Sequence, residues 1–341
     1  MNYIMYMSAM TNPKVTKPKT ISIVIPVYQG NLTLQTLVGQ ISQVRDEMES
    51  RSDCAYSIDE IIFVDDYSQD GSSKLIHELS NQYEWITPIW LSRNYGQHAA
   101  TLAGMSSSRG EMVVTMDEDG QHAPNDIIKL LEVAATTKAE LVYAEFGDIS
   151  SHRNWRNSFS KLAKLIAMKI LLPKRMKRFS SFRLIDGELA RTVSAYAGNG
   201  VYLDVALTWV VDNIETCKID SRSELRQRSG YSFRTLLSHF WRLVLSSGTR
   251  PLRMVTITGL ASSVIAILGG LVQIFRRLAN DIPVAGWTSM TVIVLFFSGL
   301  ILLSLGVLAE YLGIVVRTVI GKPLYIIRSS PRIDLRNEVQ K

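Results

Sequence analysis

Two long stretches without a charged residue constrain this chain more than any other feature of its sequence. Residues 255–275 and 288–309 are uncharged over 21 and 22 positions. An α-helix rises about 1.5 Å per residue and a bilayer core is roughly 30 Å thick, so each stretch is long enough to span a membrane. Helices buried in soluble proteins rarely run so long without a charge, which disfavours that alternative. We therefore expect two transmembrane helices, and the twelve-residue loop between them favours an antiparallel hairpin.

Basic residues gather on the outer flanks of this expected hairpin. The flanks carry Arg242, Arg250, Arg253, Arg317, Lys322, Arg328, Arg332 and Arg336, whereas the loop carries Arg276 and Arg277 beside Asp281. The positive-inside rule then places both flanks and both termini in the cytoplasm, at the inner membrane of the cell. The net charge of +6 lies largely on these flanks, so anionic lipid headgroups explain it and we expect no nucleic-acid partner.

The rest of the chain has the pattern of an α/β domain. Short apolar, β-branched runs alternate with helix-like stretches; the runs are 21–27, 60–66, 86–92 and 111–117, and the helix-like stretches are 31–50, 72–83, 95–108 and 124–138. Such alternation predicts βαβ units and a mainly parallel sheet flanked by helices. We expect Ser72 to cap one helix and Pro124 to lie in the first turn of another. No G-x-G-x-x-G follows the first run, which disfavours a dinucleotide-binding oxidoreductase.

Acidic residues follow two of these predicted strands. Asp117, Glu118 and Asp119 come after one, and Asp65 and Asp66 end another. Ligands of parallel sheets bind at the carboxyl ends of the strands. Adjacent carboxylates repel one another, and a bound Mg²⁺ or Mn²⁺ that also takes phosphate oxygens usually neutralises this repulsion. The alternative is an acidic loop without a metal, because such loops are common. The Asp65–Asp66 pair exceeds what a turn requires and can accept hydrogen bonds from a base or ribose.

Four ordered motifs carry a family resemblance: IPVYQG (25–30), FVDDYSQDGS (63–72), LSRNYGQHAATLAG (91–104) and MDEDGQHAPND (116–126). In this order they resemble the inverting family 2 glycosyltransferases of the GT-A fold. The closest likeness is to the branch that moves a sugar from a nucleotide donor to a polyprenyl phosphate, which includes dolichyl-phosphate mannose synthase. SSFRLID (180–186) and YLD (202–204) look most like the undecaprenyl-phosphate 4-deoxy-4-formamido-arabinose transferases.

The resemblance implies three overlapping groups of site residues. The nucleotide sugar would contact Pro26, Tyr28, Asp65, Asp66, Asp117, Glu118, Arg228, Ser229 and Tyr231. Catalysis would depend on Asp117, Asp119 and Arg183, the last facing the phosphates or the acceptor. Mg²⁺ or Mn²⁺ would be held by Asp119 and Gln121.

The chain also departs from the family pattern. Relatives usually have Tyr-Asn-Glu after the first strand and D-A-D-L-Q at the metal, whereas this chain has Gly30, Glu118 and Gly120 at the differing positions. The loop that closes over the diphosphate lacks the usual arginine, glycine and lysine, with Glu224, Gln227 and Gly230 in their places. These departures keep a non-catalytic relative in view. A processive polysaccharide synthase of the same family is a second alternative, which is disfavoured because Trp209 and Trp241 do not lie in a QxxRW-type motif.

The expected organisation has five parts. Residues 1–19 form a flexible lead-in without a secretory signal, 20–230 the GT-A catalytic domain, 231–254 an amphipathic juxtamembrane helix, 255–316 the two spans and 317–341 a cytoplasmic tail. The basic stretch 154–172 suits either a membrane-surface helix or a solvated one. Gly269, Gly270 and Gly299 would allow helices to pack within or between chains, so a homo-oligomer is possible.

Overall fold

The computed structural model describes residues 17–50, 54–146, 179–197, 202–219, 250–278, 286–321 and 323–331. These residues divide into two compact units. The sheet unit comprises the described residues up to 219 together with 323–331, and the helical unit comprises 250–321.

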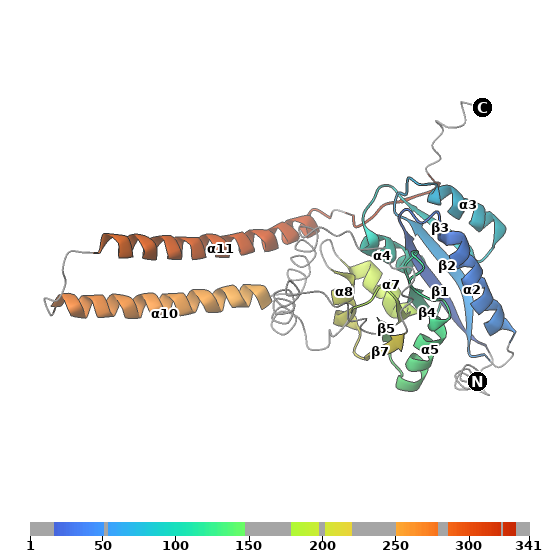
Figure 1. Cartoon of the computed structure of the whole chain (residues 1–341), viewed down its shortest axis with the longest axis horizontal. Coiled ribbons are helices and arrows are strands. Elements are labelled where there is room, and N and C mark those ends of the chain that lie inside the picture. Colours follow the sequence, from blue (N-terminus) through green and yellow to red (C-terminus); the bar gives the residue numbers. More distant parts are fainter. Residues whose placement is uncertain are drawn as a thin grey trace, which may run out of the picture. The chain divides into compact units, whose positions relative to one another are not determined.

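An eight-stranded sheet forms the centre of the sheet unit (Figure 1). Its strands are β1 (Lys19–Val27), β2 (Tyr56–Asp65), β3 (Ile86–Leu91), β4 (Met112–Thr115), β5 (Leu141–Phe146), β6 (Arg183–Asp186), β7 (Ile214–Ile219) and β8 (Ile327–Arg328). They lie in the order β7-β5-β6-β4-β1-β2-β3-β8. β6 and β8 pair antiparallel with their neighbours, and every other pairing is parallel. The mainly parallel sheet is therefore confirmed.

Helices cover both faces of this sheet. Helices α2 (Leu34–Glu49), α3 (Ser72–Gln82) and α5 (Asp126–Thr137) pack on one face, and α4 (Gln97–Ser107), α7 (Gly187–Tyr196) and α8 (Leu203–Val210) pack on the other. Successive strand side chains point to opposite faces, so Ile23 and Ile25 join the first core and Val24 joins the second. Burial on both sides explains why the strands read as unbroken apolar runs.

Two helix starts differ from the prediction. Ser72 is the first residue of α3 rather than its cap, because Gly71 occupies the cap position at φ 95°. The Asp70 carboxylate instead accepts hydrogen bonds from the Ser72 amide at 3.1 Å and its hydroxyl at 2.6 Å. Helix α5 begins at Asp126, so Pro124 lies before the helix and its carbonyl accepts from the Ile127 amide at 3.0 Å.

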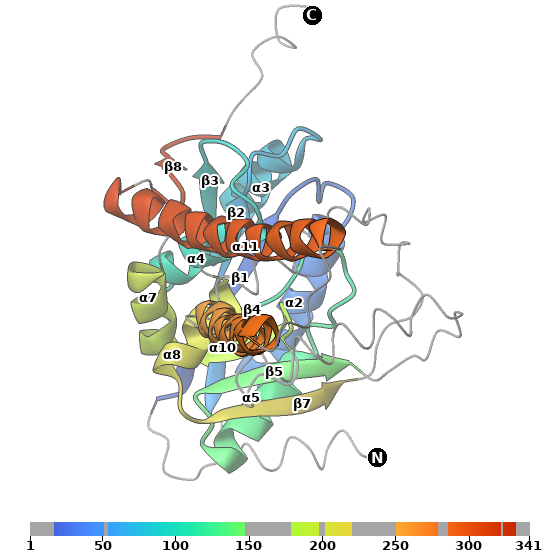
Figure 2. The same ribbon diagram turned by 90° about the vertical axis from the view of Figure 1, so that its left-hand side faces the viewer.

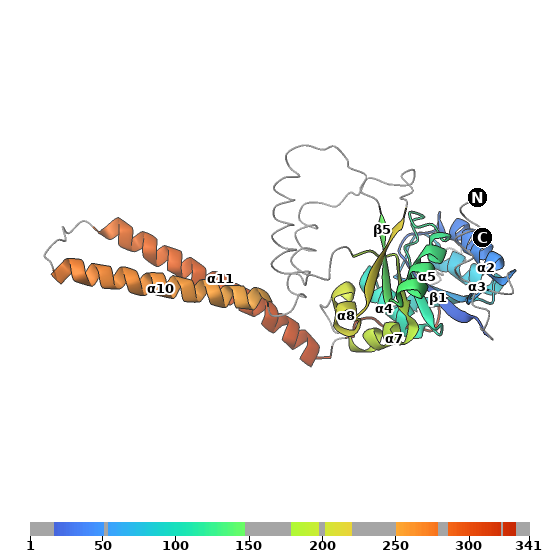
Figure 3. The same cartoon turned by 90° about the horizontal axis from the view of Figure 1, so that it is seen from below.

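The helical unit contains α10 (Arg250–Leu278) and α11 (Trp287–Val319), which run antiparallel alongside each other (Figure 3). Within the described residues, one segment is long and apolar enough to cross a membrane: Phe296–Val316, with a mean hydropathy of 2.2. It begins and ends later than the predicted span 288–309. The first span, expected within α10, stays a prediction. A Cβ added at Gly269 or Gly299 would meet nothing within 4 Å, so these glycines do not join the two helices.

Parts of the predicted cytoplasmic tail, 317–341, belong to a helix and a strand. Residues 317–319 still belong to α11, whereas β8 pairs with β3 at the edge of the sheet (Figure 2). Of the predicted juxtamembrane helix 231–254, the structure describes only 250–254, which form the first turn of α10. The lead-in before residue 17 and the basic stretch 154–172 lie outside the described residues.

Helix α4 approaches the sheet closely at Gly104, which gives a test of the packing. A Cβ at this position would overlap Val24 and lie 3.0 Å from Val64 Cγ2. We expect Gly104→Ala to lower the free energy of unfolding by about 1–3 kcal/mol through overpacking. The control is Gly39→Ala on the exposed side of α2, where nothing lies within 4 Å; it should raise stability by roughly 0.5–1 kcal/mol. Denaturant unfolding of the full chain in detergent compares the two variants. Equal changes in their free energies of unfolding would refute the close contact between α4 and the sheet at Gly104.

Candidate active site at the carboxyl edge of the sheet

The predicted acidic residues meet at the carboxyl ends of three neighbouring parallel strands. β1 lies between β2 and β4, with Val27 opposite Asp65 and Val24 opposite Thr115. Asp66 therefore follows β2 beside the end of β1, and Asp117 follows β4 on its other side. Gln29 and Tyr67, just past β1 and β2, have φ angles of 66° and 67°. Non-glycine residues in this region are uncommon and gather at functional sites, which supports a ligand site at this edge.

Asp117 is held from three directions. Its carboxylate accepts hydrogen bonds from Gln97 Nε2 at 2.5 Å and from Ser181 Oγ at 2.6 Å. Its amide donates to His122 Nδ1 at 3.0 Å. Gln97 begins α4 and Ser181 precedes β6, so residues distant in the chain set the direction of one carboxylate.

His122 is a buried support for this acidic segment. Its ring stacks between Phe146 and Phe182, with centroids 5.4 and 5.0 Å away and interplanar angles of 12° and 16°. Burial lowers the pKa of His122, which leaves the imidazole neutral with Nδ1 free to accept from Asp117. The histidine thus positions the segment without adding charge.

Glu118 explains two departures from the family pattern at once. Its side chain crosses from the end of β4 to the end of β1, where its carboxylate accepts from the Tyr28 amide at 3.0 Å. It fills the space above Gly30, since a Cβ there would lie 2.9 Å from Glu118 Cγ and 3.2 Å from Val27 Cγ1. Burial and the neighbouring acids Asp117 and Asp119 raise the pKa of Glu118 to about 7. The acid missing at position 30 is therefore replaced in space by the extra acid at 118.

Asp119 is exposed and hydrogen-bonded to its predicted partner in metal binding. Its two carboxylate oxygens accept from the Gln121 amide at 3.0 Å and from Gln121 Nε2 at 2.6 Å. Gly120 forms the turn between them at φ 74°. Among the described residues, no cluster of three or more histidine, cysteine or acidic side chains can hold a metal alone. Mg²⁺ commonly takes one or two carboxylates and completes its shell with substrate phosphates and water, so the donor set fits such a site.

Asp65 and Asp66 are both buried and bonded within the protein. Asp65 accepts from the Ser68 amide at 3.0 Å and from the Ser73 hydroxyl. Asp66 accepts from the Tyr95 and Gly96 amides, each at 2.7 Å. Burial raises the pKa of Asp66, although these amides oppose the shift. Both carboxylates organise the loops of the site, and their contact with a base or ribose stays a prediction.

Arg183 is buried beside Asp204, and its expected contact with the phosphates or the acceptor stays a prediction. Its side chain is only 3% exposed, and its guanidinium is paired with Asp204. Arg183 Nε also donates to Thr115 Oγ1 at 3.0 Å, and Tyr143 donates to Asp204 at 3.0 Å. Burial alone would lower the pKa of Arg183, but the facing Asp204 carboxylate raises it, so the guanidinium stays charged. The structure shows Arg183 as a buried anchor of β6.

Of the remaining predicted residues, two belong to the part of the chain that the structure describes and three do not. Tyr28 is 47% exposed at the site, whereas Pro26 is buried within β1. Arg228, Ser229 and Tyr231 lie outside the described residues. Gln97, Ser181 and His122 had no predicted role, although all three lie within the quoted motifs 91–104, 116–126 and 180–186.

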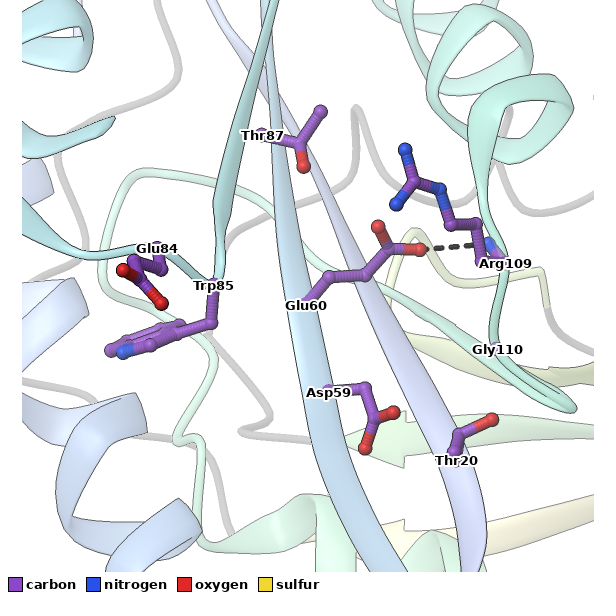
Figure 4. A pocket seen from close by; sticks show the side chains of 8 residues that line it. All are labelled: Thr20, Asp59, Glu60, Glu84, Trp85, Thr87, Arg109 and Gly110. Atoms are coloured by element: carbon purple, nitrogen blue, oxygen red, sulfur yellow. Dashed lines mark hydrogen bonds between the residues drawn. The ribbon is translucent and has the colours of Figure 1, made fainter. Parts of the chain in front are cut away.

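A separate polar cleft of about 190 Å³ opens at the opposite, amino-terminal edge of the sheet (Figure 4). Glu60 lines the cleft from β2, and its carboxylate accepts hydrogen bonds from the Ser22 hydroxyl and the Arg109 backbone amide, both at 2.7 Å. These bonds connect β1, β2 and the segment between α4 and β4. The cleft is distinct from the site because it lies at the other ends of the strands.

The fold and the site together describe an α/β protein with a cluster of acidic residues at the carboxyl edge of its parallel strands. The family model for glycosyl transferase family 2 matches residues 22–194, just over half of the 341 residues. The chain belongs to glycosyl transferase family 2, and its sheet unit has the GT-A-like arrangement expected from the sequence.

Curated relatives match along most of their length. The SfII prophage-derived bactoprenol glucosyl transferase of Shigella flexneri is 28% identical over 92% of this chain and 98% of its own. An undecaprenyl-phosphate 4-deoxy-4-formamido-L-arabinose transferase of Aeromonas hydrophila is 28% identical over 93% and 95%. Among solved structures, glucosyl-3-phosphoglycerate synthase of Mycobacterium tuberculosis with Mn²⁺ and UDP-glucose superposes with a TM-score of 0.48, at 16% identity over 72% of this chain and 82% of that one.

The shared space of Gly30 and Glu118 predicts coupling between these two positions. We expect Gly30→Ala to lower the free energy of unfolding by about 1–3 kcal/mol, because the new methyl group displaces Glu118 from the Tyr28 amide. In a Glu118→Ala background the same change should cost at least about 0.5 kcal/mol less. A double-mutant cycle measured by denaturant unfolding tests this, and strictly additive effects would show that the side chains do not compete.

The burial of Arg183 predicts a stability defect. Arg183→Ala should lower the free energy of unfolding by about 3–5 kcal/mol, because Asp204 is left buried without its partner. Replacing both residues, as Arg183→Met with Asp204→Leu, should recover part of this loss. Lys74→Ala, at an exposed pair on α3, is the control and should stay within about 0.5 kcal/mol of wild type. Unchanged stability with weaker donor binding would instead support the phosphate-facing role.

Proposed function

We propose that this family 2 glycosyltransferase moves a sugar from a nucleotide-diphosphate donor to a polyprenyl phosphate, of undecaprenyl type, at the cytoplasmic face of the inner membrane. The observation that carries the proposal is the convergence of Asp66, Asp117, Glu118 and Asp119 at the carboxyl edge of β1, β2 and β4. Parallel sheets bind ligands at this edge. Two relatives that align with more than nine-tenths of this chain are named as a bactoprenol glucosyl transferase and an undecaprenyl-phosphate 4-deoxy-4-formamido-L-arabinose transferase.

Each site residue has a role in the proposed displacement. Asp117, fixed by Gln97 and Ser181, would orient the donor sugar and diphosphate. Exposed Tyr28 would lie against the base, on a backbone held by Glu118. The acceptor phosphate is already ionised near neutral pH, so the proposed mechanism requires no strong general base. A single in-line attack would invert the anomeric carbon.

Asp119 and Gln121 would hold a divalent cation, Mg²⁺ or Mn²⁺, shared with the donor diphosphate. Such a cation neutralises charge on a leaving diphosphate. Both Asp119 oxygens accept from Gln121, one from its backbone amide and one from its side-chain Nε2. An amide nitrogen cannot bind a cation, so the side-chain oxygen of Gln121 would be its metal ligand.

The helical unit would serve the acceptor. α11 carries the apolar segment Phe296–Val316, and its side chains Ile301, Leu302 and Leu303 are each at least 60% exposed. An exposed apolar surface of this length suits lipid rather than water. Anchoring restricts the search for a lipid acceptor to the membrane plane, which raises its effective concentration at the site.

The decisive assay offers a panel of radiolabelled nucleotide sugars to the purified full-length protein with undecaprenyl phosphate and Mg²⁺ or Mn²⁺. We expect label in the lipid fraction with one donor, and loss of transfer on chelation with EDTA. Asp119→Ala should lower turnover roughly 100-fold or more while the protein stays folded, because several kcal/mol of charge stabilisation is lost. Asn125→Ala, an exposed neighbour, should keep wild-type turnover. An active Asp119→Ala enzyme would refute the metal assignment, and donor binding without transfer would favour a non-catalytic relative.

A further inference from the structure

The residues that follow α11 return to the sheet unit. We call Pro323–Arg328 the C-terminal strap. Its strand β8 pairs with the edge strand β3, with Arg328 opposite Trp90 and Ile327 opposite Leu91 (Figure 2). The Ser92 amide extends this pairing by donating to the Ile326 carbonyl at 2.9 Å. The strap lies well beyond residue 194, where the match to the family model ends.

The strap is attached at a second place, on α4. The Tyr325 hydroxyl is hydrogen-bonded to Ser106 Oγ at 2.9 Å, in the last turn of that helix. Leu324 and Tyr325 are half-buried and pack against the core between α4 and the sheet. Ile326 and Ile327 are 49% and 47% exposed, so the side chains that grip α4 are those of the preceding two residues.

These two attachments flank the segment that holds the site acids. Residues 92–96 connect β3 to α4, and the Ser92 hydroxyl is hydrogen-bonded to the Tyr95 hydroxyl at 2.9 Å. The amides of Tyr95 and Gly96 hold Asp66, and Gln97 in the first turn of α4 holds Asp117. The strap is bonded at the start of this segment and at the far end of the helix that follows it.

We propose that the C-terminal strap positions the donor site, with Tyr325 as the positioning residue. It restrains residues 92–96 and α4 together, so that the Tyr95 and Gly96 amides keep their grip on Asp66 and Gln97 keeps its grip on Asp117. This inference rests on the proposed function for the identity of the ligand. A strand that only covered the β3 edge would need pairing with β3 alone, whereas the strap also binds the helix that carries Gln97.

The test uses the full-length protein in detergent, with Tyr325→Ala and the matched control Ile327→Ala, whose side chain is 47% exposed on the same strap. Hydrogen–deuterium exchange is measured in peptides covering residues 92–97. We expect the Tyr95 and Gly96 amides to exchange roughly fivefold faster in Tyr325→Ala, as for the loss of about one net hydrogen bond, and at the wild-type rate in the control. The donor KM should rise roughly threefold to tenfold, with kcat and the acceptor KM unchanged.

Each outcome decides a different point. The proposal is overturned if the Tyr95 and Gly96 amides of the Tyr325→Ala variant exchange at the wild-type rate. It is also overturned if the variant loses kcat and melting temperature while both KM values stay unchanged. Faster exchange in a protein that transfers no sugar supports the strap's positioning role and counts against the proposed function. If Tyr325→Ala does not fold, Tyr325→Phe removes only the hydroxyl bond to Ser106, and Ser106→Ala removes that bond together with the bond from Ser106 to the Ala103 carbonyl. Both should then give a roughly twofold rise in exchange, and no rise would overturn the proposal.

Discussion

The direction shared by β1, β2 and β4 is the constraint on which the rest of the structure depends. β1 is buried from Ile21 to Val27 and pairs in parallel with a strand on each side. Because the three strands point the same way, the residues that follow them emerge at one edge of the sheet. Acids more than forty positions apart in the chain thus become neighbours, and a small number of loops can surround one ligand.

At that edge, the acids are held by bonds rather than left to repel one another. Asp66 accepts two backbone amides, and Asp117 accepts from Gln97 and Ser181. Glu118 accepts a hydrogen bond from the Tyr28 amide, while burial and the neighbouring acids raise its pKa to about 7 and so favour the uncharged form. Exposed Asp119 is bonded to Gln121 beside it. This arrangement leaves Asp119 the most accessible acid for a cation and a diphosphate.

Much of the fold was predictable because its signals are local. Four apolar runs, the helices between them and the strand-end acids can each be read from a few adjacent residues, and all four strands were confirmed. Strands β6 and β8 are only four and two residues long, and they run against the parallel pattern, so periodicity could not reveal them. The site supports were missed for a related reason: Ser181 bonds to an acid 64 positions away. The pairing of Arg183 with Asp204 was not predicted, because a charge in a motif does not reveal that Asp204 is buried beside it.

The sequence by itself determined the family, the α/β alternation and the presence of a long apolar helix near the C-terminus, because each depends on patterns within short windows. Tertiary structure alone decided which side chains meet. It placed Glu118 in the space left by Gly30, buried Arg183 against Asp204 and returned the segment after α11 to the edge of β3. Such pairings depend on strand order, register and packing across the sheet. Side chains compete there for the same small space, and no window of adjacent residues contains both partners.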